Sequence, residues 1–281
     1  MSKFRQNPIT KEWTIIATER KRRPIAVGPQ SASSAVERCP FCPGNEDLTG
    51  PDVYQLDGVR VIPNKYPITD FHEVIIHSPD HEKDIDELPL EQVELILRTY
   101  RDRYNFYKNK RPDFYIHFYN NAGKEAGASL KHPHSQLVVF NCIPEEVLEE
   151  IEGAKDFFER KHRCPYCDLL NKEISSKERI VLESEFFVVL TPFESAWPYE
   201  ITLFPKEHQP DFGEISDGEV GDLASALKKT LQAYNKVLSK PDRNFWIHSL
   251  PVRNQPPALR SRLSALGCQL LSLAFGFNSQ N

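Results

Sequence analysis

The sequence predicts an α+β fold in which an antiparallel sheet covered by helices occurs twice, with the second copy incomplete. Three observations support this prediction. A Cys-x-x-Cys pair occurs at 39–42 and again at 164–167, strand and helix patterns recur in the same order after each pair, and the repetition stops near residue 253. A chain of 281 residues is long enough for two such copies.

The repeat is visible residue by residue. Cys39-Pro40-Phe41-Cys42 recurs as Cys164-Pro165-Tyr166-Cys167, 125 residues later. The later matches lie 127 to 131 residues apart, a drift that short loop insertions explain. They are 72–76 with 199–203, His81 with His208, 86–88 with 213–215, and 114–117 with 245–248.

Each copy contains strands and one long helix. Val and Ile content predicts strands at 59–62 and 73–77, and another at 13–17. Apolar residues at helical spacing predict a helix over 90–107 and its counterpart over about 217–238. A charged helix over 145–161 would link the two copies.

We therefore expect three regions. Residues 1–143 form the first copy, with the first cysteine pair and a histidine-bearing strand, and 144–253 form the second copy without its closing strand. Residues 254–281 form an atypical tail. This tail has no His, Asp, Glu or Lys, and Leu263 and Ala265 stand where the repeat would place two histidines.

Three explanations of the tail remain open. The second copy has decayed, the reading frame shifts near Asn254 by nature or by a sequencing error, or the tail is a divergent apolar helix. The abrupt change in composition favours the frameshift.

Composition excludes several classes of protein. A net charge of −5 argues against a nucleic-acid partner. No apolar run approaches the roughly 20 residues that span a bilayer, and the first residues lack the apolar core of a signal peptide. Six cysteines are too few for a disulfide scaffold, so we expect a cytoplasmic protein without a membrane partner.

The most informative segment is His132-Pro133-His134-Ser135-Gln136. On an extended strand, His132, His134 and Gln136 would share one face. Such a row offers a nucleophilic imidazole, a second histidine that orients it or binds a metal, and an amide donor for an oxyanion. Upstream, the loop 121–129 contains Gly123 and Gly127 and could bring backbone amides close to a phosphate. Together these features favour phosphoryl or nucleotidyl transfer through histidine over a surface strand with scattered histidines.

The cysteine pairs have the spacing of zinc ligands. A site made by Cys39, Cys42, His81 and His132 would leave His134 as the nucleophile, whereas the alternative for the cysteines is a pair of buried thiols. The second copy offers Cys164, Cys167 and His208. A fourth ligand from His248 or His162, a three-ligand site and a vacant site all remain open there.

Two further segments are weaker signals. The basic run 20–24 could clamp a diphosphate, although on composition alone a solvated basic turn is the better interpretation. Asn64 follows a strand, where its amide could meet a ligand. The chain has neither the Gly-x-x-x-x-Gly-Lys-Ser/Thr nor the Gly-x-Gly-x-x-Gly pattern, which disfavours ATPase and dinucleotide folds.

These residues together resemble the galactose-1-phosphate uridylyltransferase family of the histidine-triad superfamily. The resemblance covers about residues 4–253, and the family also has a duplicated histidine-triad-like fold. It depends on an ordered set of segments: 5–13, 20–24, 39–42, 64–67, 78–81 and 127–136.

The resemblance implies a ping-pong transfer in which His134 attacks the α-phosphorus of a nucleotide sugar and forms a nucleotidyl-histidine. A sugar 1-phosphate or phosphate would then reverse the step. Members of the family are typically dimers, so a homodimer is expected. The implied roles are phosphoryl contacts for Gln136, Ser129 and Asn121, nucleotide contacts for Arg20, Arg23 and Asn64, and zinc ligation for Cys39, Cys42, His81 and His132.

The chain departs from the family after residue 253, where relatives place a second His-x-His strand and further sugar-contacting residues. Sugar choice and activity are therefore open. Ser135 also occurs in relatives that act as ADP-sugar phosphorylases. A nucleotide hydrolase and a catalytically impaired, zinc-stabilised nucleotide-binding protein are the remaining alternatives.

Overall fold

The computed structural model describes residues 3–6, 13–17, 38–112, 114–209 and 211–249. Arg20, Arg23 and the tail 254–281 lie outside the described residues, so the predictions for them are not tested. No described helix is both long enough and apolar enough to cross a bilayer.

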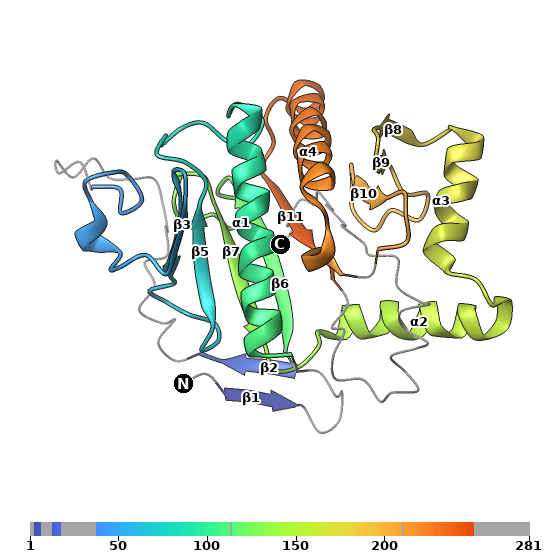
Figure 1. Cartoon of the computed structure of the whole chain (residues 1–281), viewed down its shortest axis with the longest axis horizontal. Helices are drawn as coiled ribbons and strands as arrows, with labels where there is room; N and C mark the ends of the chain where they lie inside the picture. Colours follow the sequence, from blue (N-terminus) through green and yellow to red (C-terminus); the bar gives the residue numbers. More distant parts are fainter. Residues whose placement is uncertain (1–2, 7–12, 18–37, 113, 210, 250–281) are drawn as a thin grey trace.

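A six-stranded antiparallel sheet forms the centre of the structure, in the order β11-β6-β7-β5-β4-β3. Five of its strands come from the first copy and one, β11, comes from the second (Figure 1). The strands are β3 (Tyr54–Leu56), β4 (Val59–Pro63), β5 (His72–Ile76), β6 (Tyr115–Ala122), β7 (His134–Phe140) and β11 (Arg243–Ile247).

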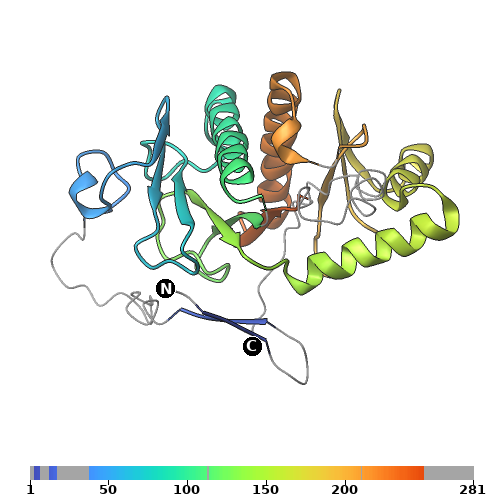
Figure 2. The ribbon, with the colours of Figure 1, turned by 60° about the horizontal axis from the view of Figure 1, so that its bottom comes forward.

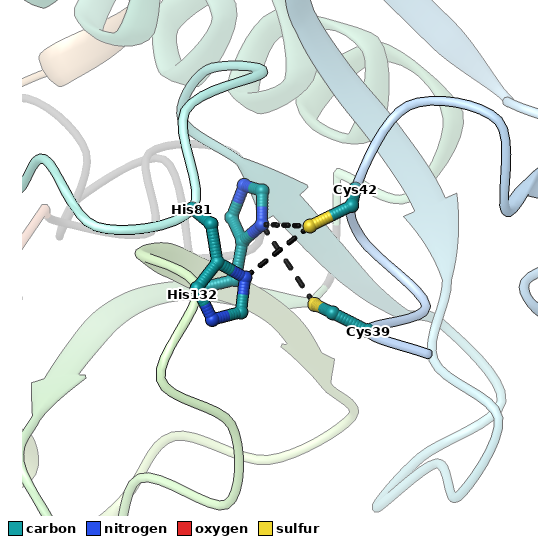
Figure 3. A group of neighbouring side chains, drawn as sticks. All are labelled: Cys39, Cys42, His81 and His132. Atoms are coloured by element: carbon teal, nitrogen blue, oxygen red, sulfur yellow. Dashed lines mark hydrogen bonds between the residues drawn. The ribbon is translucent and has the colours of Figure 1, made fainter. Parts of the chain in front are cut away.

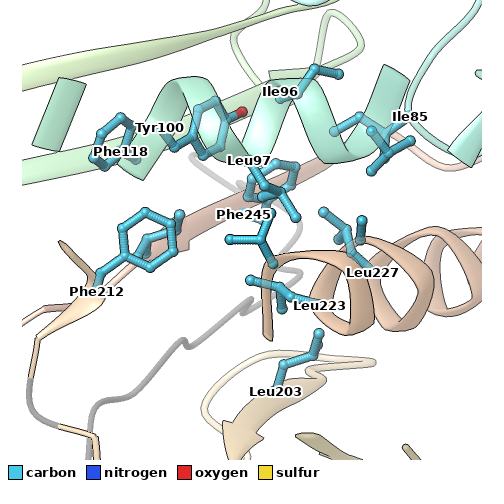
Figure 4. Packing of buried hydrophobic residues seen from close by; sticks show 14 of the residues in the cluster. Ile85, Ile96, Leu97, Tyr100, Phe118, Leu203, Phe212, Leu223, Leu227 and Phe245 are labelled. Carbon is cyan, nitrogen blue, oxygen red and sulfur yellow. The ribbon is translucent and has the colours of Figure 1, made fainter. Parts of the chain in front are cut away.

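Two long helices pack side by side on one face of this sheet (Figures 1 and 2). They are α1 (Leu90–Lys110) and α4 (Asp217–Leu238), close to the bounds that apolar spacing predicts. Helix α4 begins with a capping box, in which the Ser216 side chain accepts from the Glu219 amide and the Glu219 carboxylate accepts from the Ser216 amide. Their facing sides and the sheet bury one continuous apolar core, part of which Figure 4 shows, including Leu97, Phe245 and Leu227.

The rest of the second copy lies beyond α4 (Figure 1). It contains α2 (Glu145–Lys161), α3 (Pro165–Ser176) and a three-stranded sheet in the order β10-β9-β8. The strands are β8 (Ile180–Glu183), β9 (Phe187–Leu190) and β10 (Thr202–Pro205). The sequence predicts α2 with these bounds but does not predict α3, whose first residue, Pro165, lies inside the second cysteine motif.

The short elements complete the description. Strands β1 (Lys3–Gln6) and β2 (Trp13–Ile16) form an antiparallel hairpin, in agreement with the strand predicted at 13–17. Two 3₁₀ turns, η2 (Glu46–Leu48) and η3 (Phe212–Glu214), follow the first cysteine pair and precede α4.

The two copies meet at equivalent strands. Strands β6 and β11, which the repeat relates, pair antiparallel with Phe118 opposite Ile247. Continued by one residue, this register sets His117 opposite its own counterpart, His248, and their ring centroids are 6.4 Å apart. An approximate two-fold relation between the copies therefore passes between these two histidines.

The long helices obey the same relation. Arg101 on α1 donates to the carbonyl of Ile215 (2.9 Å), and Lys228 on α4 donates to the carbonyl of Leu88. Donors and acceptors are each 127 residues apart. A second exchanged pair follows the same offset: Asn105 to the Gly213 carbonyl (2.9 Å) and Gln232 to the Asp86 carbonyl (3.0 Å). Each copy thus holds the segment that precedes the other copy's helix, which confirms the duplicated α+β fold.

Candidate active site and metal-binding groups

The sheet register sorts the histidine segment onto two faces. Opposite residues of an antiparallel pair share a face, so Gln136 lies beside Tyr119 of β6 and Val74 of β5, on the face away from α1. His134 lies opposite Ile76, and continuation of the β6 register places Asn121 on its other side. The face away from the helices therefore carries the predicted chemistry.

His134 is the first residue of β7 and is 7% exposed. Its Nδ1 lies 2.9 Å from the carbonyl oxygen of His132. A carbonyl only accepts, so this bond requires a proton on Nδ1 and places the imidazole lone pair at Nε2. The Phe41 ring packs edge-on against the imidazole, with centroids 5.1 Å apart. The His134 ring is thus held in one orientation, with its lone pair on Nε2.

His132 differs from its predicted position. The sequence places it on the same strand face as His134, but the strand begins only at His134, and His132 precedes it across Pro133. Its ring is turned toward the cysteine pair, while its carbonyl holds His134. The two histidine rings therefore lie in different surroundings, that of His132 beside the cysteines and that of His134 at the start of β7.

Gln136 is oriented by two side chains. Its Oε1 accepts from Asn64 Nδ2 (3.1 Å) and from His72 Nε2 (2.9 Å). His72 must be protonated at Nε2, because its Nδ1 accepts from the amide of Ile68 (2.9 Å). With Oε1 engaged, the Gln136 amide NH₂ is the end available to a phosphoryl oxygen. His72 is not among the predicted site residues, and its place at the start of the repeated segment 72–76 is the signal that could have indicated it.

Asn64 is engaged at both ends of its amide. Its Oδ1 accepts from the Tyr66 amide (2.8 Å), and its Nδ2 donates to Gln136. The bonds of Asn64 therefore support Gln136, and direct contact with a nucleotide stays a prediction.

Behind β7, on the helix side, lies a buried polar network that sequence analysis does not predict. His77 Nε2 lies 2.7 Å from Ser135 Oγ, and the Tyr100 hydroxyl donates to the same oxygen. Burial lowers the pKa of His77 to about 3, so this histidine is neutral. Asn120 completes the support by donating from Nδ2 to the His134 carbonyl (2.8 Å). These contacts fix the strand that carries His134.

The four residues predicted to bind zinc come together in the structure (Figure 3). Cys42 Sγ lies 3.2 Å from His81 Nδ1 and 3.6 Å from His132 Nδ1, and Cys39 Sγ lies 3.8 Å from His132 Nδ1. A tetrahedral zinc ion with bonds of about 2.0–2.3 Å requires ligand separations of roughly 3.5 Å. Two sulfurs and two imidazole nitrogens at these distances could bind zinc.

His132 has the further contact typical of a metal ligand. Its Nε2 lies 2.9 Å from the Ser78 carbonyl, which fixes the proton on Nε2 and directs the Nδ1 lone pair toward the cysteines. Desolvation lowers the pKa of His132 and so favours the neutral imidazole that metals require.

The second cysteine pair forms a smaller group with His208. Cys167 Sγ lies 3.5 Å from His208 Nδ1, and Cys164 completes three potential ligands. Neither histidine considered as a fourth ligand belongs to this group in the described part of the chain. His248 Nδ1 instead lies 3.1 Å from a Glu150 carboxylate oxygen, and His162 ends α2 in the left-handed conformation.

The glycine-bearing loop uses part of its backbone for bonds within the protein. We expect its backbone amides to meet a phosphate, but three of them are already bonded. The Gly127 amide donates to the Lys124 carbonyl, the Ala128 amide to the Gly123 carbonyl, and the Glu125 amide to the Asp242 carboxylate. Ser129 is exposed at the end of this loop. These three amides are therefore not available to a phosphate, and the exposed Ser129 side chain is the polar group that the end of the loop offers.

Comparison with known proteins gives consistent results over most of the chain. Residues 150–254 match the family model described as galactose-1-phosphate uridyl transferase, C-terminal domain. Residues 22–143 match the N-terminal domain of a domain of unknown function, DUF4931.

Individual relatives extend these matches. ADP-glucose phosphorylase of Arabidopsis thaliana is 31% identical, over 89% of this chain and 79% of the relative. Galactose-1-phosphate uridylyltransferase of Thermotoga maritima is 30% identical, over 85% of this chain and 78% of the relative. The crystal structure of the Arabidopsis enzyme with bound ADP-glucose superimposes with a TM-score of 0.78 at 29% identity, covering 100% of this chain and 91% of that one.

These relatives are enzymes that share the duplicated fold, and the similarity extends through both copies. The chain therefore belongs to the galactose-1-phosphate uridylyltransferase family, within the histidine-triad superfamily.

Proposed function

We propose that this protein is a nucleotidyltransferase that moves a nucleoside monophosphate from a nucleotide sugar to a phosphate acceptor through a nucleotidyl-histidine at His134. The observation that carries the proposal is the bond from His134 Nδ1 to the His132 carbonyl, which places the proton on Nδ1 and the lone pair on Nε2. The acceptor would be a sugar 1-phosphate or phosphate.

The neighbouring groups suit this reaction. In the first step, Nε2 attacks the α-phosphorus, a P–N bond forms, and the bond to the sugar 1-phosphate oxygen breaks. Negative charge develops on the phosphoryl oxygens during this step, and hydrogen-bond donors that are already in place stabilise it. The Gln136 amide, held by Asn64 and His72, is such a donor. Asn121, beside His134 in the sheet, and Ser129 are proposed to contact the same oxygens.

Zinc bound by Cys39, Cys42, His81 and His132 would have a structural role. It would hold the segment before β7 in place, and with it the carbonyl that orients His134. The group formed by Cys164, Cys167 and His208 is proposed as a second, weaker metal site.

Two candidate reactions differ in the base of the nucleotide sugar, uracil or adenine. The first candidate reaction is the transfer of a uridylyl group from UDP-glucose to a hexose 1-phosphate. The similarity to an ADP-glucose phosphorylase that was crystallised with ADP-glucose favours ADP-sugar phosphorolysis as a second candidate.

Intact-protein mass spectrometry can test both candidates. The protein is incubated with UDP-glucose or ADP-glucose without an acceptor, and we expect the mass to increase by one uridylyl or adenylyl group. His134→Ala should abolish this adduct and turnover, a loss of at least about 10⁴-fold, while its zinc content stays unchanged. His162→Asn, a change at the exposed end of α2, is the matched control and should behave like the wild type. Full activity in His134→Ala would disprove the assignment.

A further inference from the structure

The loop that carries Ser129 is held by a residue of the other copy. Strand β11 pairs with β6, and Arg243 lies opposite Ala122 at the end of the ladder. The preceding residue, Asp242, is therefore next to Gly123, where the loop leaves β6. One Asp242 carboxylate oxygen accepts a 2.6 Å hydrogen bond from the Glu125 amide.

The approach of Asp242 requires glycine at position 123. Gly123 has φ of +93°, and a Cβ built on it would lie 2.0 Å from Asp242 Oδ1. A side chain at 123 would therefore both strain the backbone and displace the carboxylate. Gly127, at the other end of the turn, has φ of +84°, and a Cβ built on it would lie 3.5 Å from Asn121 Nδ2. The loop thus fits between a second-copy carboxylate and a predicted phosphoryl-contacting residue.

A tight turn of the backbone before β11 places the Asp242 carboxylate beside the loop. Ser239 and Lys240, which follow α4, both have left-handed backbone conformations, with φ of +59° and +55°. They reverse the chain within a few residues and bring it back alongside β6, with Asp242 at the start of the returning segment. Left-handed conformations at two consecutive non-glycine residues cost free energy, which indicates that the surrounding contacts hold the turn.

We infer that Asp242 is a positioning residue for nucleotidyl transfer, and that it acts by fixing the loop 123–129 so that Ser129 can contact the transferred phosphoryl group. The inference rests on the proposed function of His134. The second copy would then contribute to the reaction by positioning a loop of the first copy, without binding a ligand or supplying a catalytic group.

The test measures the rate of adduct formation at His134 in a single turnover with UDP-glucose or ADP-glucose, whichever labels the wild type. Asp242→Ala should lower this rate by roughly 10- to 100-fold, the cost of a misplaced contact. Asp242→Asn, which keeps the shape and loses the charge, should lie between Ala and the wild type. Asp156→Ala, which removes an exposed carboxylate of α2, is the matched control and should leave the rate unchanged.

Combination with Ser129→Ala separates positioning from a general loss of stability. If Asp242 acts through Ser129, the Ser129→Ala, Asp242→Ala double variant should be no slower than the slower single variant. Multiplicative effects of the two changes would overturn the inference, as would a wild-type rate in Asp242→Ala.

Hydrogen exchange provides a readout that does not depend on turnover. Peptides that cover 123–129 should exchange faster in Asp242→Ala than in the wild type or in Asp156→Ala, and unchanged exchange would also overturn the inference. Absence of any adduct in the wild type would instead contradict the proposed function, and with it the catalytic role of Asp242. Faster loop exchange would then show only that Asp242 holds the loop.

Discussion

The two copies share their framework but differ in the polar residues placed on it. Equivalent helices α1 and α4 donate equivalent bonds to each other's preceding segments, at an offset of 127 residues. At the same offset, the buried His77 of the first copy becomes Phe204, and Arg103 becomes Thr230. Contacts that join the copies recur in both, whereas the His77 imidazole and the Arg103 guanidinium are replaced by the Phe204 ring and the Thr230 hydroxyl.

This difference indicates that the two copies contribute differently, the first with buried polar groups and the candidate nucleophile and the second with structural support. The first copy combines burial of polar groups with a candidate nucleophile, which is costly unless every group is paired. The second copy has the apolar Phe204 and the uncharged Thr230 at the matched positions, and it contributes packing, the strand β11 and the Asp242 carboxylate. Variants at matched positions can test each part of this comparison.

The largest effect is expected at the cysteine pairs. Cys42→Ala should lose one zinc ion per chain, lower Tm by more than about 10 °C, and slow adduct formation at least 10-fold, because His132 belongs to the metal group and also orients His134. Cys167→Ala should leave the rate within about 2-fold of the wild type. Metal analysis, thermal unfolding and the adduct assay measure these effects, and equal losses of rate in the two variants would remove the proposed difference between the groups.

Arg103 is the next position. Its guanidinium donates to both carboxylate oxygens of Glu73 (2.9 and 2.5 Å), and Tyr107 donates to the same buried carboxylate (2.7 Å). Arg103→Met should lower the free energy of unfolding by about 3–5 kcal/mol, because it leaves Glu73 buried without its cation.

Thr230→Val is the matched change in the second copy. Among the described residues the Thr230 hydroxyl bonds within its own helix, to the Ala226 carbonyl (2.7 Å), so the loss of this hydroxyl should cost less than about 1 kcal/mol. Denaturant unfolding of both variants measures the difference, and similar costs would mean that the first copy gains no special stability from its polar groups.

The smallest effect concerns pH. The pKa of His77 falls from its usual value near 6.5 to about 3 in the folded protein, chiefly through burial and despite the nearby Asp84 carboxylate. The unfolded chain therefore binds the proton more readily, so this histidine destabilises the fold as pH falls from about 6.5 toward 3. Between pH 7 and pH 5 its contribution should be about 2 kcal/mol.

His77→Gln should remove that part of the acid sensitivity, because glutamine does not titrate. Its counterpart in the second copy, Phe204, has no titratable group either. Unfolding free energies of the wild type and the variant at both pH values provide the measurement. An unchanged pH dependence would show that His77 is not neutral in the folded state.

Periodicity and repetition predict the framework of this fold well. The bounds of α2 and α4 and the strands near 59–62 and 73–77 follow from apolar spacing and composition. Helix α3 does not, because Pro165 and the cysteine motif conceal a helix start in what reads as a metal-binding turn.

The candidate site is predicted less completely than the fold. The four-residue group around Cys39 follows from ligand types and spacing. The roles of His72, His77 and Tyr100 do not, because they depend on which side chains the sheet register brings to the front and back of β7. Likewise, no local pattern connects Asp242 with Gly123, which are 119 residues apart in the chain.

The pairing of β6 with β11 has a consequence for any attempt to separate the copies. Without β11, the eight residues of β6 would form the border of the sheet, with unsatisfied amides and carbonyls along one side. A border of this kind recruits whatever strand is nearest, including the same strand of another molecule. The second copy therefore moves the border of the described sheet from the eight residues of β6 to the five residues of β11, and separation of the copies would lengthen the exposed edge.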